Sequence, residues 1–157
     1  MSKKYYLAYG SNLNLEQMAF RCPNAKPIGT INLKDYRLVY NGRADEFSYL
    51  TIEKCEGSIV PLGLWEVSYL DVFSLDSYEG YPTFYSKYYI PIKIGDKNKK
   101  ALIYVMNQYF DYHLPSEEYI ITCMDGYEDF GFDKAILEKA LADTIDNLPK
   151  KINIKRP

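Results

Sequence analysis

The sequence predicts an α+β domain built on a mixed, mainly antiparallel sheet that is able to curve into a small barrel. Three observations lead to this prediction. Most β-prone runs precede the last two helical segments instead of alternating with them, which is typical of α+β proteins. Neighbouring runs are separated by short polar segments, as in hairpins. A chain of 157 residues with 47% hydrophobic residues suits one domain, taken here as 1–157 with a basic, flexible tail at 150–157.

The first expected elements are a strand and a short helix. Residues 5–9 form an apolar, β-prone run that is expected to be a buried strand. Asn14 is placed to cap a helix over residues 15–21, and Gln17 occupies the third helical position, where it can complete a capping box. Pro23 then ends this helix.

The middle of the chain is expected to be rich in strands. Residues 55–58, CEGS, are predicted to form a hairpin turn between the last two of four β-rich runs, which cover 26–33, 36–41, 49–54 and 59–67. Ser68 then begins a second helix. Asp71 is its capping-box partner three residues on, and Gly80 is placed to end the helix.

A long hairpin and two helices complete the prediction. Strands over 84–94 and 101–107, joined by the polar residues 95–100, form the clearest hairpin of the chain. Ser116 is expected to cap a third helix that ends near residue 129, and Asp133 to cap a fourth. The apolar stripe of the fourth helix consists of Ile136, Leu137, Ala140, Leu141 and Ile145.

Composition and motifs exclude several classes of function. The net charge of -2 argues against a nucleic-acid-binding surface. No segment has the roughly 18 consecutive apolar residues of a membrane span, and the N-terminus lacks the pattern of a signal peptide. The cysteines at 22, 55 and 123 match no metal motif and are interpreted as reduced thiols of a cytoplasmic protein. With neither a P-loop nor a GxGxxG motif, no metal or cofactor is expected.

The junction after the first strand, Gly10, Ser11 and Asn12, is the first candidate site. A helix N-terminus presents unpaired backbone N–H groups with partial positive charge, and Gly10 allows a ligand to approach the backbone closely. With two short polar side chains, this arrangement suits a carboxylate or a developing oxyanion. The alternative is an ordinary glycine turn that leads into a capped helix, and YGSN alone does not decide between the two.

The second candidate is Glu79, at the end of the second expected helix. It continues the apolar stripe of Val72 and Leu75 at helical spacing. Desolvation there would raise the pKa of the carboxyl group and suit it to proton transfer near neutral pH. The alternative is a solvent-facing glutamate at a fraying helix end. The only histidine, His113, is expected to be a loop residue in contact with solvent, without the motif of a nucleophilic hydrolase.

Six segments carry a family resemblance: YLAYGSNLN, QMAFRCPNA, DYRLVYNG, GLWEV, LDSYEGYPTFY and PSEEYIITCMDGYEDFGF. In this order they resemble the γ-glutamylcyclotransferase, or AIG2-like, family, and the resemblance covers residues 5 to about 142. Its most specific parts are the Tyr-Gly-Ser-x-Leu loop after the first strand and the helix-end glutamate within YEGYP.

The resemblance implies a small mixed β-barrel with helices packed around it. It also implies a reaction that cleaves a γ-glutamyl amide without water and gives 5-oxoproline and a free amino acid or amine. In the implied reaction, the α-amino group of the substrate attacks its own γ-carbonyl, with Glu79 as the general acid/base. The resemblance further implies that the γ-glutamyl group is bound by Tyr119, near the start of the late helix, and by the loop. The loop positions are Tyr9, Gly10, Ser11, Asn12 and Leu13.

Two alternatives stay open. The γ-glutamylamine branch acts on side-chain-linked compounds such as γ-glutamyl-lysine. A non-catalytic relative would keep the pocket and bind the γ-glutamyl group without turnover, although a desolvated Glu79 beside an anionic ligand argues against it. The expected partner is a small γ-glutamyl compound, with neither nucleic acid nor membrane. The sequence does not decide between a monomer and a homodimer.

Overall fold

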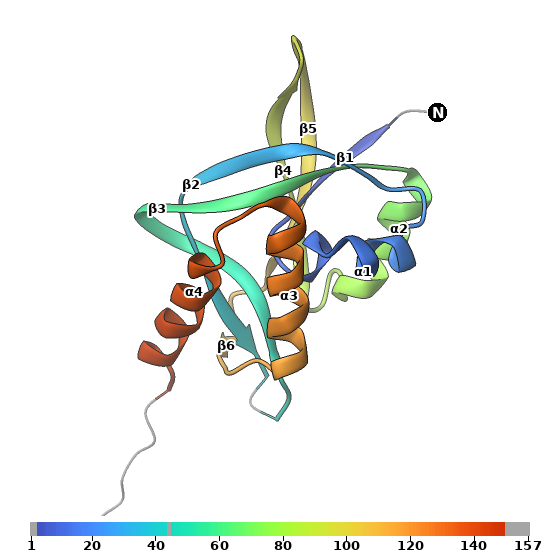
Figure 1. Cartoon of the computed structure of the whole chain (residues 1–157). Helices are drawn as coiled ribbons and strands as arrows, with labels where there is room; N and C mark the ends of the chain where they lie inside the picture. Colours follow the sequence, from blue (N-terminus) through green and yellow to red (C-terminus); the bar gives the residue numbers. More distant parts are fainter. Residues whose placement is uncertain (1–2, 44, 150–157) are drawn as a thin grey trace, which may run out of the picture.

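A computed structural model describes residues 3–43 and 45–149, and the tail predicted at 150–157 lies outside this range. These described residues form one six-stranded sheet and four α-helices (Figure 1), which confirms the predicted α+β class. The elements are β1 (Lys4–Ala8), the 3-10 turn η1 (Ser11–Leu13), α1 (Leu15–Arg21), β2 (Lys26–Gly42), β3 (Ser48–Val67), α2 (Tyr69–Glu79), β4 (Tyr85–Ile94), β5 (Lys97–Met106), β6 (Asp111–Tyr112), α3 (Glu117–Phe130) and α4 (Ala135–Asp146).

The sheet is mixed and mainly antiparallel, as predicted, but it is open and not a closed barrel. Its strand order is β4-β5-β1-β3-β2-β6. Tyr6 of β1 lies opposite Trp65 of the antiparallel strand β3 and opposite Leu102 of the parallel strand β5. The strands β4 and β6 are the two edges. Because β6 pairs with β2 over only two residue pairs, it offers too little backbone to bridge one edge to the other.

The hairpin turn predicted at residues 55–58 is wrong, because these residues continue the long strand β3. The register of β2 against β3 shifts between Lys34 and Tyr36, and Asp35 there has a φ of 65°. The Asp35 carboxylate accepts a hydrogen bond of 3.0 Å from the backbone N–H of Gly57. Pairing with β2 therefore keeps residues 55–58 in an irregular part of the β2–β3 pair. A local turn signal in the sequence does not reveal this pairing.

Three of the four helices begin as their caps predict. The side chain of Asn14 accepts a hydrogen bond from the backbone N–H of Gln17, and Ser116 caps α3 in the same way. Ser68 and Asp71 form a complete capping box at the start of α2. At α1 only the Asn14 half of the expected capping box is present among the described residues, without a bond from the Gln17 side chain. The other cap hydrogen bonds predicted from sequence are the ones that delimit these helices.

The second helix ends as predicted, while the fourth departs from its prediction in two details. Gly80 adopts a left-handed conformation with a φ of 64° directly after α2, where a side chain would be strained. Asp133 accepts a hydrogen bond from Ala135, but Lys134 occupies the N-cap position of α4. Ile145, predicted to belong to the apolar stripe, is 51% exposed, since the last turn of α4 passes the edge of the core.

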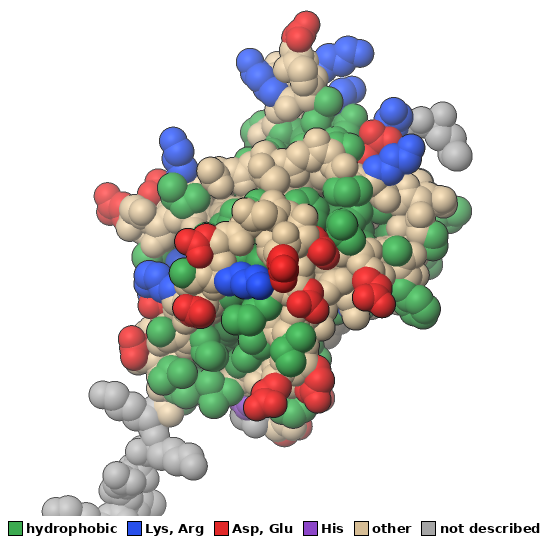
Figure 2. Space-filling model, in the orientation of Figure 1, with side chains coloured by type: hydrophobic (Ala, Val, Ile, Leu, Met, Phe, Trp, Pro, Cys, Tyr) green, Lys and Arg blue, Asp and Glu red, His purple; other side chains and the backbone are tan. Residues whose placement is uncertain are grey.

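The β4–β5 hairpin projects from the body of the molecule (Figure 1), and lysine side chains gather around its tip in Figure 2. Its turn contains only residues 95 and 96, because Ile94 pairs directly with Lys97. Residues 97–100, expected in the connection, extend β5 instead. In the described part of the chain, no helix is long and apolar enough to cross a membrane.

Candidate active site

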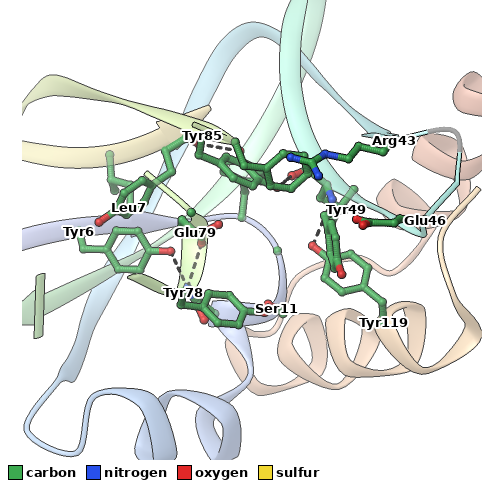
Figure 3. A pocket seen from close by; sticks show the side chains of 17 residues that line it. Tyr6, Leu7, Ser11, Arg43, Glu46, Tyr49, Tyr78, Glu79, Tyr85 and Tyr119 are labelled. Atoms are coloured by element: carbon green, nitrogen blue, oxygen red, sulfur yellow. Dashed lines mark hydrogen bonds between the residues drawn. The ribbon is translucent and has the colours of Figure 1, made fainter. Parts of the chain in front are cut away.

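A cavity of about 330 Å³ opens where β1, α2 and the β2–β3 connection meet (Figure 3). It is lined by Tyr6, Leu7, Tyr9, Gly10, Ser11, Asn12, Arg43, Glu46, Tyr49, Leu50, Tyr78, Glu79, Gly80, Phe84, Tyr85, Tyr104 and Tyr119. A cavity of this size matches the lower range of small-molecule sites. Seven of the 17 tyrosines of the chain line it, so the unusual tyrosine content builds the site as well as the strands.

The loop after β1 is held against α3. A Cβ atom at Gly126 would lie 2.7 Å from the backbone nitrogen of Asn14, so only glycine lets the helix approach the loop this closely. The Asn14 side chain donates a hydrogen bond of 3.1 Å to the carbonyl of Thr122, and the Leu15 N–H donates one of 3.0 Å to Asp129. These contacts give the loop one position relative to the cavity.

Within the loop, Asn12 connects several groups of the site. Its side-chain nitrogen donates to the Tyr6 hydroxyl at 2.9 Å and to a Glu79 carboxylate oxygen at 3.4 Å. Its side-chain oxygen accepts a hydrogen bond from the Arg21 guanidinium. Among the described residues, no acceptor is found for the backbone N–H groups of Ser11 and Asn12. The loop therefore keeps backbone hydrogen-bond donors available, as the predicted binding of a carboxylate or an oxyanion requires.

Glu79 is the last residue of α2, and its side chain is half-buried. Part of its surface faces the cavity, whose walls here are largely tyrosine rings and keep the carboxylate away from bulk water (Figure 3). Burial raises the pKa of Glu79 to about 7, and the positive charge of Arg21 opposes this rise. A carboxyl group with this pKa can both accept and donate a proton near neutral pH.

Arg21, at the end of α1, is a residue of the site that the sequence analysis missed. Its guanidinium carbon lies 3.4 Å from the centroid of the Tyr78 ring. The Tyr78 hydroxyl in turn lies 3.2 Å from the Ser11 hydroxyl. Arg21 falls within the family-like segment QMAFRCPNA, but a helix-end arginine carries no local signal of where its side chain points. Arg21 connects α1, α2 and the loop without lining the cavity.

Several tyrosine hydroxyls are anchored to the backbone. Tyr9 donates to the carbonyl of Tyr104 at 2.6 Å, and Tyr85 donates to the carbonyl of Leu50 at 2.8 Å. Tyr119 accepts a hydrogen bond of 3.1 Å from the Leu50 N–H. Burial raises the pKa of each of these tyrosines above its usual range, so they remain neutral hydroxyl groups.

The predicted site residues, with one exception, come together in this cavity. Those that line it are Tyr9, Gly10, Ser11, Asn12, Glu79 and Tyr119. Leu13 is fully buried and not among the lining residues. Its side chain packs over Gly63 of β3, where a Cβ atom would lie 2.5 Å from it. His113 also lies outside the cavity lining, and its backbone carbonyl accepts a hydrogen bond from the Ser48 hydroxyl.

The outer part of the cavity contains residues that the sequence analysis did not identify. Arg43 and Glu46 come from the β2–β3 connection, and Tyr49 follows at the start of β3. The Tyr49 ring contacts the rings of Tyr119 and Phe84, with centroid distances of 5.1 and 6.0 Å. Charged residues in a hairpin connection are usual for a solvated turn, so only the tertiary structure associates these residues with the site.

Comparisons with solved structures reveal several chains of similar fold. A γ-glutamyl cyclotransferase is 22% identical with a TM-score of 0.74, and the match covers 98% of this chain and 93% of that one. An uncharacterized human protein is 23% identical with a TM-score of 0.75, over 99% of this chain and 94% of that one. YkqA from Bacillus subtilis is 20% identical with a TM-score of 0.69, over 96% of this chain and 57% of that one. At these identities the likeness shows the fold.

Sequence comparison identifies the family. Curated proteins give no match to this sequence. The family model described as γ-glutamyl cyclotransferase, AIG2-like, matches residues 6–126, which include the loop after β1, Glu79 and Tyr119. The chain belongs to the AIG2-like γ-glutamyl cyclotransferase family.

Proposed function

We propose that this protein is a γ-glutamylcyclotransferase, which releases 5-oxoproline and a free amino acid or amine from γ-glutamyl amides. One observation carries the proposal. The carboxyl group of Glu79, with a pKa of about 7, shares a cavity with the loop after β1 and lies 3.4 Å from the side chain of Asn12. A proton-transfer group and a set of hydrogen-bond donors are thus within reach of one small ligand.

The proposed reaction needs no nucleophile from the protein. The α-amino nitrogen of the substrate attacks the γ-carbonyl carbon, and a new C–N bond closes a five-membered ring. The bond between that carbon and the leaving nitrogen then breaks. Because both reacting atoms belong to one molecule, binding in the reactive geometry can contribute on the order of 7–11 kcal/mol. This accounts for a cavity lined by tyrosines and without cysteine or histidine among its described residues.

Glu79 performs the proton transfers in this proposal. Its carboxylate accepts a proton from the substrate ammonium, so that the amine becomes nucleophilic. The resulting carboxylic acid donates this proton to the leaving nitrogen as the tetrahedral intermediate collapses. The regenerated carboxylate then takes the second proton from the ring nitrogen, which gives the neutral amide of 5-oxoproline, and passes it to the released amine. A pKa of about 7 suits both steps, because neither protonation state is strongly disfavoured at neutral pH.

The loop supplies hydrogen-bond donors for the negatively charged groups of the substrate. The backbone N–H groups of Ser11 and Asn12 are available for the oxyanion or for the substrate α-carboxylate. Gly10 leaves room for the ligand, since a Cβ atom there would lie 3.0 Å from the Tyr119 hydroxyl. Tyr9 and Tyr119 shape the walls around the glutamyl chain.

The test is incubation of the protein with a panel of γ-glutamyl amino acids and γ-glutamyl amines, with 5-oxoproline measured by chromatography. α-Glutamyl-alanine is the control, because its amide is formed by the α-carboxyl group and cleavage of that amide does not form 5-oxoproline. We expect 5-oxoproline and a stoichiometric amount of the leaving amine from at least one γ-glutamyl compound. No release from any member of the panel would contradict the proposal.

A further inference from the structure

The cavity has two chemically different sides. In Figure 3, Tyr6, Tyr78 and Glu79 lie on one side, while Arg43 and Glu46 lie on the other and point toward the cavity. Among the described residues that line the cavity, Arg43 is the only one with a positive charge. A cation in this position calls for an explanation, because the proposed chemistry at Glu79 does not use it.

The guanidinium of Arg43 is available to a ligand. Its central carbon lies 5.7 Å from the centroid of the Phe110 ring, a cation–π distance that positions the group without neutralising it. Phe110 is itself held by Phe84, a cavity residue, at a centroid distance of 4.7 Å. Within residues 3–43 and 45–149, no acidic side chain forms an ion pair with Arg43. Among the described residues, its charge therefore has no acidic partner, and the Phe110 ring contacts it beside the cavity.

The proposed function determines which end of the substrate reaches Arg43. The α-amino group must lie near Glu79 for proton transfer, and the α-carboxylate is attached to the same carbon atom. The glutamyl end is therefore confined to the side of the cavity with Glu79 and the loop. The leaving group, on the other side of the scissile amide, must extend toward the side with Arg43.

Resting on that proposed function, we propose that Arg43 binds a carboxylate of the leaving group, so that the preferred substrates are γ-glutamyl amino acids or peptides and not γ-glutamyl derivatives of simple amines. A guanidinium pairs with a carboxylate through two parallel charge-assisted hydrogen bonds, which add geometric specificity to the attraction between the charges. Glu46 on the same side disfavours leaving groups with a second negative charge, such as aspartate or glutamate.

The test compares γ-glutamyl-alanine with γ-glutamyl-ethylamide, which differ only in the carboxylate of the leaving group. We expect the wild-type protein to show a higher kcat/KM with γ-glutamyl-alanine. In Arg43→Gln the ratio of the two kcat/KM values should fall about tenfold, as expected for loss of one charge-assisted contact at a solvent-accessible position. Arg43→Lys should lie between, because it keeps the charge but not the forked geometry.

Lys54→Gln is the matched control. Lys54 is an exposed residue of β3 outside the cavity lining, and its replacement removes the same charge from the same strand pair. We expect this variant to keep the wild-type ratio. An equal loss with both substrates in Arg43→Gln would overturn the inference, because it would place Arg43 at the glutamyl end. A ratio unchanged by Arg43→Gln would overturn it as well.

Binding distinguishes a failure of this inference from a failure of the proposed function. Calorimetric titration of the two compounds into Glu79→Gln, with and without Arg43→Gln, measures the preference without turnover. A carboxylate preference that depends on Arg43, together with no 5-oxoproline from the wild type, would support the inference as a property of the binding site and contradict the catalytic proposal. Equal binding of both compounds, or binding of neither, would overturn the inference.

Discussion

Replacement of Glu79 by glutamine removes the only group that the proposed reaction uses for proton transfer and leaves the cavity nearly the same size. The proton transfers then have no positioned acid or base. General acid–base catalysis is typically worth about 10²–10⁴-fold, so kcat should fall by about that factor. Substrate affinity should change much less, because the glutamyl end is assigned to the backbone N–H groups of Ser11 and Asn12.

The pH dependence of the wild type tests the same assignment. In the proposed reaction the carboxylate form of Glu79 is needed to accept the ammonium proton, and burial raises the pKa of Glu79 to about 7. The value of kcat/KM should therefore rise with pH and level off above about 7. In Glu79→Gln the remaining activity should lack this rise, since no carboxyl group titrates at the reacting atoms.

The stability of the fold should respond in the opposite direction. In the unfolded chain Glu79 titrates near its ordinary value of 4.5, and in the folded protein near 7. Between these values the folded state binds more protons, so the stability from this group is complete below about pH 4.5 and is lost as pH rises to about 7. The shift corresponds to at most about 3 kcal/mol, and access of water to the cavity reduces it to about 1–2 kcal/mol.

Urea denaturation of wild type and Glu79→Gln at pH 4 and pH 8 measures this difference. We expect similar stabilities at pH 4, and Glu79→Gln to be more stable by about 1–2 kcal/mol at pH 8. Glu56→Gln, at an exposed position of β3 outside the cavity lining, is the control and should behave like the wild type. Near-equal turnover by wild type and Glu79→Gln would refute the catalytic assignment. Equal stability at pH 8 would refute the desolvation argument.

Three further substitutions test the surroundings of Glu79. Arg21→Gln removes a charge that lowers the pKa of Glu79, so the rise of kcat/KM should shift to higher pH, and an unshifted profile would contradict the electrostatic role. Gly10→Val places a side chain against the Tyr119 hydroxyl and should abolish 5-oxoproline release without unfolding the protein, as checked by a thermal melt. Gly126→Ala forces a Cβ atom to within 2.7 Å of the loop backbone. Its overpacking cost of about 1–3 kcal/mol should outweigh the gain of about 0.5–1 kcal/mol in helix propensity, and a urea midpoint at or above that of the wild type would contradict this.

The sequence was most informative where structure depends on neighbours in the chain. The caps at Asn14, Ser68 and Ser116 and the end of α2 at Gly80 follow from hydrogen bonds and backbone conformations that involve residues only a few positions apart. The sequence also indicated the loop after β1 and the helix-end Glu79 as candidate site residues. In the loop, a glycine and short polar residues follow an apolar strand, and Glu79 is a carboxylate on an apolar helix stripe.

The tertiary structure decided what depends on distant segments. Residues 55–58 have the composition of a turn, yet pairing with β2 keeps them in a strand. In the sequence, Arg21 and Arg43 look like ordinary surface arginines. Only the packing of the chain brings Arg21 to the loop and Arg43 to the cavity. The contact between Asn12 and Glu79 joins positions 67 residues apart. The raised pKa of Glu79 likewise arises from rings of β1, β4 and β5 that exclude water together, and no local pattern encodes such an enclosure.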